Sequence, residues 1–173
     1  GGAAGFFAAL NLKELAPTAD VCIVEATRRP LSKVQISGGG RCNVTHHCFD
    51  PKLLVQRYPR GSLELRGPFS QFQPQDTIAW FARRGVTLKA EADGRMFPDS
   101  NRSQTIIDCF MSEANRLGVE LHIGQSIARI ALSDQKTFNL YDKQDQLWRH
   151  VDAVVYCTGS VPASWEMMRG LGH

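Results

Sequence analysis

The sequence predicts an α/β fold, and three observations lead to this prediction. A glycine-rich turn opens the chain, a short apolar run ending in an acidic residue follows at 20–25, and a succession of strand-like runs occupies residues 119–151. A turn and a carboxylate at this spacing are typical of a nucleotide-binding βαβ unit, in which backbone amides reach a pyrophosphate and the carboxylate reaches a ribose. We therefore expect a Rossmann-like parallel sheet with an attached β-meander.

The opening turn is expected to lead into a helix. Residues 1–9 read GGAAGFFAA, which follows the pattern G-x-G-x-x-G-x-x-x-A from its second position onward. The first glycine of the pattern and the strand before it are absent from this sequence. Small residues near the turn permit close packing, and Phe7, Leu10 and Leu15 give an apolar stripe, so the spacing predicts a helix over 3–15.

The apolar run at 20–25 is predicted to be a buried parallel strand. It is rich in β-branched residues and is bounded by Asp20 and Glu25. Glu25 lies twenty residues after Gly5, which is the separation at which dinucleotide-binding folds place the carboxylate that contacts the ribose. A glycine cluster alone is weak evidence, and the acidic residue in register strengthens it.

A second glycine cluster lies between 26 and 45, where glycines and prolines are expected to exclude long regular structure. Gly38, Gly39 and Gly40 are consecutive, so this backbone can adopt positive φ and lie flat against a ligand. Successive exposed amides can form an anion-binding nest, and Arg41 adds a donor fork suited to phosphate. The alternative is a flexible surface turn. Loops that follow the carboxyl ends of parallel strands form the ligand crevice in such sheets, which favours the binding interpretation.

The remaining elements follow from periodicity and turn residues. Pro74 is expected in the first turn of a helix that Gly85 ends, and Gly118 is expected to close a helix that Asn101 or Ser103 caps. The four runs between 119 and 151 are expected to form the meander, and 153–157 a buried strand that leads into Thr158-Gly159. The expected helices are 51–57, 74–84, a segment from about 101 to 117, and 164–171; the expected strands are 86–89, 94–97, 119–123, 126–133, 137–142, 147–151 and 153–157.

Several of these motifs together resemble a known family. They are the GGAAG turn, the strand ending in Glu25, Lys33, the run SGGGRCNVT at 37–45, the run GRMFP at 94–98 and the final LGH. In this order and spacing the chain resembles the YhiN/BaiN-like bacterial flavoproteins, which are also described as NAD(P)/FAD-dependent oxidoreductases or aminoacetone-oxidase-like FAD-binding enzymes. The resemblance covers essentially the whole chain, and SGGGRCN is its most specific element.

This resemblance implies an FAD-binding domain of the glutathione-reductase type, which longer members interrupt with an inserted domain. Residues 1–173 are then expected to be a partial FAD-binding domain, truncated at both ends, with the insertion beginning near 173. The implied function is that of a flavin-dependent oxidoreductase with FAD as cofactor and NAD(P)H as a candidate electron donor. A non-catalytic FAD- or nucleotide-binding module is the alternative. The SGGGRCN run argues against an NAD(P)-only dehydrogenase, which has no evident need for a second glycine-dense loop.

The resemblance also implies a set of cofactor contacts. The glycine turn would line the pyrophosphate, Glu25 would hold the adenosine ribose, and the second glycine cluster would approach the FAD. Two departures from the family pattern are the SVP sequence after Gly159 and the run RRPLS at 28–32, where relatives commonly carry a glycine before the lysine. No catalytic residue is assigned. The implied cofactor-binding residues are Gly2, Ala3, Ala4, Gly5, Glu25, Ala26, Lys33, Ser37, Gly38, Gly39, Gly40, Arg41, Cys42, Asn43, Thr158 and Gly159.

Composition indicates which partners to expect. The net charge is only +3, and the pairs at 28–29 and 83–84 lack interleaved aromatics, so no nucleic-acid partner is expected. No apolar run approaches the roughly 20 residues that span a bilayer. Five scattered cysteines without a C-x-x-C pair suggest a reducing compartment, with the cytoplasm as the default. The substrate and the oligomeric state stay open.

Two reactive-site interpretations compete with the flavin reading. Cys42, His46, His47 and Cys48 are close in sequence, but adjacent histidines do not easily face one ion and no second ligand pair has zinc-like spacing, so no metal is expected. Cys42 would need a lowered pKa to act as a redox thiol or nucleophile. Since no resolving cysteine is evident, we expect it to be a packing residue.

Overall fold

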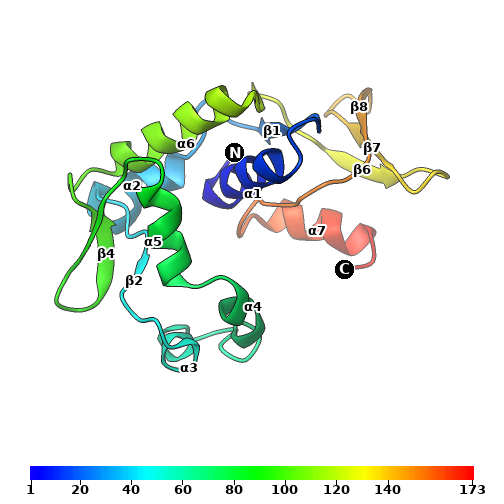
Figure 1. Ribbon diagram of the computed structural model, residues 1–173. Helices are drawn as coiled ribbons and strands as arrows, with labels where there is room; N and C mark the ends of the chain where they lie inside the picture. The colour runs from blue at the N-terminus through cyan, green and yellow to red at the C-terminus, as the bar shows by residue number, and fades with distance from the viewer. The chain divides into compact units, whose positions relative to one another are not determined.

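The computed structural model describes residues 1–173 and divides them into two compact units (Figure 1). Unit 1 combines residues 1–32 with residues 110–173, and unit 2 is the intervening segment, residues 33–109. The second boundary falls inside α6 (Ser103–Leu117). Each unit has its own set of buried apolar side chains.

A parallel strand pair underlies unit 1. The strands β1 (Cys22–Glu25) and β5 (Glu120–Ile123) run parallel, with Glu25 opposite Ile123. The helix α1 (Ala3–Leu15) buries Phe6 and Leu10 completely, and the Phe6 ring lies 5.9 Å from that of Phe110. Parallel strands need a long crossover connection, which here includes all of unit 2. The predicted α/β class, the helix over 3–15 and the strand ending at Glu25 are confirmed.

The meander of unit 1 has three strands rather than the predicted four. The strands β6 (Arg129–Leu132), β7 (Phe138–Tyr141) and β8 (Leu147–Val151) pair antiparallel in that order. The segment 119–123, expected to open the meander, is β5 and pairs with β1 instead. The pairing extends beyond the strand, because the amide of Gln125 donates to the carbonyl of Glu25 at 3.0 Å. Periodicity gave the strand correctly but could not identify its neighbour.

The segment 153–157 was predicted to be a buried strand, and this prediction is wrong. It belongs to no ladder, and Val155 is 66% exposed. An apolar, β-branched run satisfies the sequence pattern of a strand, but a strand also requires an adjacent backbone to receive its hydrogen bonds. Neither the β1–β5 pair nor the meander provides one. The chain then enters α7 (Pro162–Gly170), close to the predicted helix at 164–171.

Unit 2 is a small antiparallel sheet with short helices. Its strands are ordered β2 (Thr45–His46), β4 (Arg95–Pro98) and β3 (Leu88–Ala90). The most deeply buried side chains include Trp80, Phe97 and Ile106. The sequence did not predict β2 or α4. The helices are α2 (Ser32–Gly40), α3 (Pro51–Leu54), the 3₁₀ helix η1 (Val55–Arg57), α4 (Arg66–Gln71) and α5 (Pro74–Ala82).

Predicted helix ends are confirmed at two glycines. Pro74 occupies the first turn of α5, and Gly85 follows its end with φ of 75°. The helix α6 ends at Leu117, and Gly118 follows it with φ of 68°. Both glycines hold the left-handed conformation that closes a helix without steric cost.

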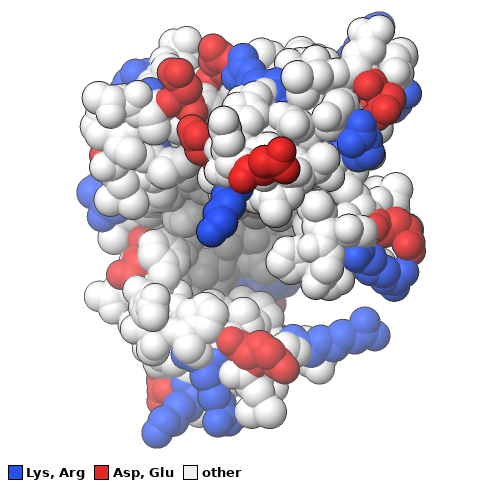
Figure 2. All heavy atoms as spheres, turned by 90° about the vertical axis from the view of Figure 1, so that its right-hand side faces the viewer, with Lys and Arg blue, Asp and Glu red and all other residues white.

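The surface of unit 1 carries charges of both signs, many of them paired. Arg129 contacts Asp145 at 2.6 Å, and Arg149 contacts Glu120 at 3.0 Å. Basic and acidic side chains are distributed over the face shown in Figure 2. None of the helices is both long and apolar enough to cross a bilayer.

We predict that Gly94→Ala destabilises the protein more than Gly85→Ala. Both glycines have positive φ, 84° and 75°, so an alanine costs about 1–2 kcal/mol of backbone strain at either position. Only at Gly94 would the new Cβ collide with the ring of His46, whereas nothing lies within 4 Å at Gly85. The collision should add about 1–3 kcal/mol. Urea unfolding would measure the difference, and equal losses would show that the His46 contact imposes no constraint.

Candidate functional site

The glycine turn of unit 1 leaves the first turn of α1 without a side-chain cap. Gly2 is the N-cap residue, with φ of −92° and ψ of −177°, and no side chain accepts from the first-turn amides. The first turn carries no acidic residue. Because the initial amides of a helix have no partner inside it, and the helix dipole is positive at this end, the start of α1 is suited to an anion.

The carboxylate of Glu25 lies directly against this turn. A Cβ built on Gly1 would be 2.5 Å from both Cβ and Oε2 of Glu25, so only glycine fits there. The Gly1 nitrogen also donates to the carbonyl of Val24 at 3.2 Å. The structure therefore brings together the two features that the sequence spacing predicted, the glycine turn and the acidic end of β1.

The carboxylate of Glu25 is positioned to accept hydrogen bonds. Its side chain is 18% exposed, and Oε1 accepts from the amide of Thr27 at 2.7 Å. Burial raises the pKa of this carboxyl and hydrogen bonds from Thr27 lower it, and the net pKa is lowered. Glu25 is thus ionised at neutral pH and can accept hydrogen bonds from two hydroxyls. Ala26, the next residue of the predicted set, is exposed.

The segment before Thr158-Gly159 passes the same turn. A Cβ on Gly5 would lie 3.6 Å from Cβ of Cys157, which places the two backbones in close contact. Thr158 and Gly159 follow immediately, are exposed, and Gly159 has φ of 68°. Although 153–157 is not a strand, it brings Cys157 against Gly5 near the start of α1.

Leu31 also contributes to this corner of unit 1. Its φ is 58°, a conformation that L side chains rarely adopt, and its side chain is 1% exposed. Its amide donates to the carbonyl of Gly1 at 2.8 Å. Left-handed backbone costs about 1–2 kcal/mol in a residue with a Cβ, which burial of a leucine offsets. Leu31 thus holds a backbone conformation that favours glycine.

The second glycine cluster lies in unit 2 and begins where a short helix breaks. The sequence predicted no long regular structure in 26–45, but residues 32–36 of α2 are helical. Ser37, with ψ of 149°, leaves the helix, and the three glycines follow with φ of 55°, 68° and 83°. The chain turns back at Cys42, whose amide donates to the carbonyl of Ser37 at 3.0 Å. The five residues before Ser37 are enough to form a short helix, and the glycines only end it.

The three glycines differ in their surroundings. A Cβ on Gly38 would lie 2.8 Å from the amide nitrogen of Asn43 and 2.9 Å from the ring of Phe97, so close packing requires glycine there. Nothing lies within 4 Å of a Cβ on Gly39 or Gly40. Positive φ and open space at these two positions leave their backbone accessible, as the binding interpretation requires.

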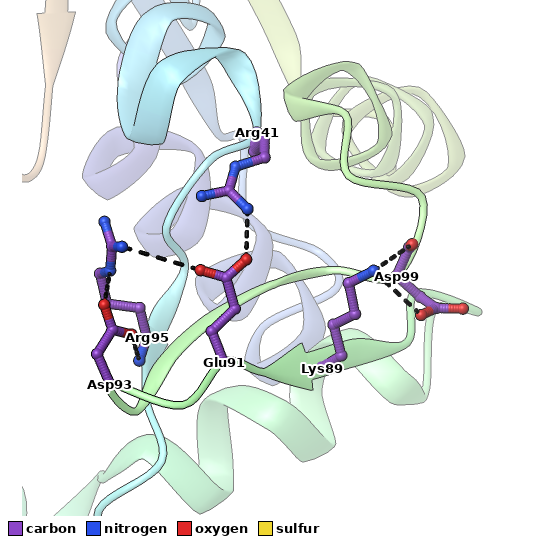
Figure 3. Close-up of polar contacts among 6 residues, drawn as sticks. All are labelled: Arg41, Lys89, Glu91, Asp93, Arg95 and Asp99. Atoms are coloured by element: carbon purple, nitrogen blue, oxygen red, sulfur yellow. Dashed lines mark hydrogen bonds and ion pairs between the residues drawn. The ribbon is translucent and has the colours of Figure 1, made fainter.

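Arg41, directly after the glycines, already has a partner (Figure 3). Its guanidinium pairs with the carboxylate of Glu91 and lies 3.9 Å from the centre of the Phe97 ring. Glu91 is also 3.8 Å from Arg95, which in turn bonds to Asp93 at 2.6 Å. Arg41 is therefore held by the β3–β4 hairpin, and this contact fixes the end of the glycine loop.

The other predicted residues of this loop are distributed between core and surface. The side chains of Lys33 and Asn43 are exposed, and Ser37 Oγ donates to the carbonyl of Val34 at 2.9 Å. Cys42 is 7% exposed, and burial raises the pKa of its thiol, with partial compensation from a hydrogen bond to Ser37. A thiol held in its protonated form is a poor nucleophile, which supports the expected packing role.

The histidines beside this loop pack on separate partners. The ring of His46 lies over Gly94, and that of His47 lies 4.7 Å from Phe49 in an edge-to-face arrangement. No group of three or more potential ligands is placed to hold a metal ion. The two rings thus serve packing in the hairpin region.

Comparison with known proteins decides the family. The sequence profile described as "HI0933-like protein Rossmann domain" matches residues 1–168. The chain belongs to this family. The HI0933-like proteins are FAD-binding, flavin-dependent oxidoreductases, so the resemblance inferred from the motifs is confirmed at the level of family.

Three curated relatives share parts of the chain. A 3-dehydro-bile acid delta(4,6)-reductase of Clostridium scindens is 27% identical over 77% of this chain. Ribosomal RNA dihydrouridine synthases of Haemophilus influenzae and Escherichia coli are 24% and 27% identical over 99% and 69% of it. The matched regions cover 32%, 40% and 29% of those proteins, so the chain spans less than half the length of each.

The residues of unit 1 fit the adenosine diphosphate half of an FAD. An uncapped helix start suits a pyrophosphate, and an ionised carboxylate against the glycine turn suits ribose hydroxyls. Sequence reasoning missed Glu91 and the packing role of Gly94. A signal for Glu91 was present, because charged residues alternate at 89, 91, 93 and 95, a period that places them on one side of a hairpin.

Proposed function

We propose that this chain is the FAD-binding part of a flavin-dependent reductase that acts on a carbon–carbon double bond conjugated to a carbonyl group. The observation that carries the flavin assignment is the Glu25 carboxylate against the glycine turn at the uncapped start of α1. The reaction class comes from the chemistry that two relatives' names share. A 3-dehydro-bile acid with delta(4,6) unsaturation and a uridine base both contain such a conjugated bond, and its reduction in uridine gives dihydrouridine.

In this proposal the residues of unit 1 bind and orient the cofactor. The amides of Ala3, Ala4 and Gly5 would bind the pyrophosphate, with Gly1 and Gly2 permitting its close approach. Glu25 would bind the ribose, and Thr158-Gly159 would line the same helix start. Bound FAD supplies hydride chemistry, and the chain supplies position and charge. No acid or base is assigned to this chain.

The loop of unit 2 is proposed as a second contact with the cofactor, on the strength of the family motif. Gly39 and Gly40 would offer open backbone amides, while the Arg41–Glu91 pair would hold the loop in shape. Lys33, Ser37, Cys42 and Asn43 complete this set. NAD(P)H is the proposed electron donor. All five cysteines are free thiols, as the proposed cytoplasmic location requires.

Replacing Glu25 with glutamine should weaken FAD binding about tenfold or more. The amide keeps the shape of the side chain but removes the charge and one acceptor, and hydrogen bonds to charged groups contribute about 1.5–3 kcal/mol. Titration of the protein with FAD by flavin fluorescence would give the dissociation constant. Asp134→Asn, an exposed turn residue of the meander in the same unit, is the control and should leave it unchanged. An unchanged constant for Glu25→Gln would remove this residue from the site.

Replacing Gly39 with asparagine should impair FAD uptake while the fold survives. Asparagine tolerates positive φ better than other residues with a Cβ, so the change adds bulk with little strain. Gly118→Asn is a matched control, because Gly118 has the same φ of 68° and also has nothing within 4 Å. Equal thermal stability of the two variants with weaker flavin binding only for Gly39→Asn is the expected result. If Gly39→Asn binds FAD normally, the three glycines form only a turn and do not contact the cofactor.

Turnover tests the reaction itself. The protein loaded with FAD should oxidise NADH or NADPH when a ketone with a conjugated double bond, or a uridine-containing RNA, is added. The corresponding saturated ketone is the control and should give no oxidation above the background with oxygen. If the protein binds FAD and neither conjugated substrate is reduced, the non-catalytic binding module is the better description.

A further inference from the structure

One segment of unit 2 carries an excess of basic over acidic residues. Residues 51–71 contain four lysines and arginines and one glutamate, so this segment carries a formal charge of +3, equal to that of the whole chain. The segment comprises α3, η1 and α4 with their connections.

These cations are exposed and have no acidic partner. Lys52, Arg57, Arg60 and Arg66 are all exposed, and none takes part in an ion pair. The β3–β4 hairpin of the same unit behaves differently, because carboxylates neutralise its cations (Figure 3). Unpaired cations gathered on one segment leave a positive field that an anionic partner can neutralise.

The same segment presents an aromatic surface on a fixed base. Leu54 and Val55 are 1% and 2% exposed and anchor the segment in the core of unit 2. Tyr58 lies between two arginines in sequence, is 41% exposed, and its ring lies 5.4 Å from that of Phe69. Tyr58 is thus an exposed ring supported from one side, as a base-stacking platform requires.

A hollow of about 470 Å³ lies beside these residues. Lys52, Gln56, Arg66 and Ser70 contribute to its lining, but most of the surface that the lining residues present to it is apolar. Asp50 is the carboxylate of this lining, and it accepts from the amide of Lys52 at 2.8 Å, which caps α3. Two cations thus lie among the residues that line a mainly apolar hollow.

We propose that the segment 51–71 is a docking surface for single-stranded RNA. Its cations would contact phosphates, Tyr58 would stack on a base, and the hollow beside them would receive the flat face of another base. This proposal rests on the proposed function and selects the RNA among its two substrate classes. It replaces the expectation of no nucleic-acid partner, which considered only the arginine pairs at 28–29 and 83–84 and a net charge averaged over the chain.

An anionic membrane is the partner that competes with RNA as an explanation of this surface, because exposed cations and leucines can also bind lipid. Binding in a lipid interface uses a helix with a continuous apolar face, whereas α3 and α4 have four and six residues. Such short helices cannot present that face. The exposed ring of Tyr58, supported by Phe69 and flanked in sequence by arginines, instead matches the needs of a nucleotide chain.

Fluorescence anisotropy with a labelled, uridine-rich single-stranded RNA of about twelve nucleotides tests this surface. The protein should bind it, with affinity falling as salt rises. Arg57→Ala/Arg60→Ala should reduce the slope of log affinity against log salt by about 1.4, since each lost phosphate contact on a single strand accounts for about 0.7. Lys136→Ala/Lys143→Ala removes the same charge from exposed turns of the meander and should change the slope little.

Substitutions at Tyr58 distinguish the contribution of base stacking from that of charge attraction. Tyr58→Ala should weaken binding by about five- to hundredfold, and Tyr58→Phe, which keeps the ring, should stay within about twofold of the unchanged protein. Circular dichroism of each variant would show that the fold persists. The proposal fails if no RNA binds, if both double variants lose affinity equally, or if the protein binds vesicles of phosphatidylserine and phosphatidylcholine and not RNA.

This assay needs neither FAD nor turnover, so its failure is distinguishable from failure of the proposed function. A protein that reduces a conjugated ketone with FAD but binds no RNA would retain the reductase assignment and lose this docking surface. A protein that binds RNA through Tyr58 but reduces nothing would keep the surface and lose the reaction.

Discussion

The contact between Gly1 and Glu25 is the constraint on which the nucleotide-binding half of this protein depends. A glycine at the first position lets the turn approach the end of β1 so closely that a Cβ would lie 2.5 Å from the Glu25 carboxylate. The amide of Leu31 reaches the carbonyl of Gly1 from the other side of the loop at 2.8 Å. One backbone position thereby sets the distance between an uncapped helix start and an ionised acceptor, the two groups that an adenosine diphosphate moiety needs.

In unit 2, contacts at both ends hold an exposed loop of glycines in one conformation. Gly38 is locked by the Asn43 backbone and the Phe97 ring, and Arg41 is locked by Glu91 above the same ring. Between these two fixed points Gly39 and Gly40 keep exposed backbone at positive φ. Rigid ends reduce the conformational entropy that an otherwise flexible glycine run would lose on binding a ligand.

The sequence predicted local features well, because glycine turns, helix ends and apolar periods depend on neighbouring residues. It placed α1, Glu25 and the ends of α5 and α6 correctly for that reason. It failed where the outcome depends on distant partners. The run at 119–123 pairs with β1 across the chain, and the run at 153–157 has strand-like residues but no neighbouring strand.

In the candidate site, too, local features could be predicted and contacts between distant residues could not. Spacing alone identified the turn and Glu25, since both belong to one local unit. It did not identify Glu91, fifty residues from Arg41 in sequence, or the packing of His46 on Gly94. The concentration of cations at 51–71 was present in the sequence, but the net charge of the whole chain concealed it. Burial of Leu54 and Val55, which only the fold reveals, turns that segment into a fixed surface.

The most direct test of the account is a competition experiment in which ADP and FMN are each titrated against protein-bound FAD. The strongest proposed contacts of unit 1 with the cofactor are those to the pyrophosphate and the adenosine ribose. ADP is therefore predicted to displace FAD, and FMN, which lacks the adenosine half, should displace it poorly. Displacement by FMN with no effect of ADP would contradict the account, because the glycine turn and Glu25 would then not be the part of the protein that holds the cofactor.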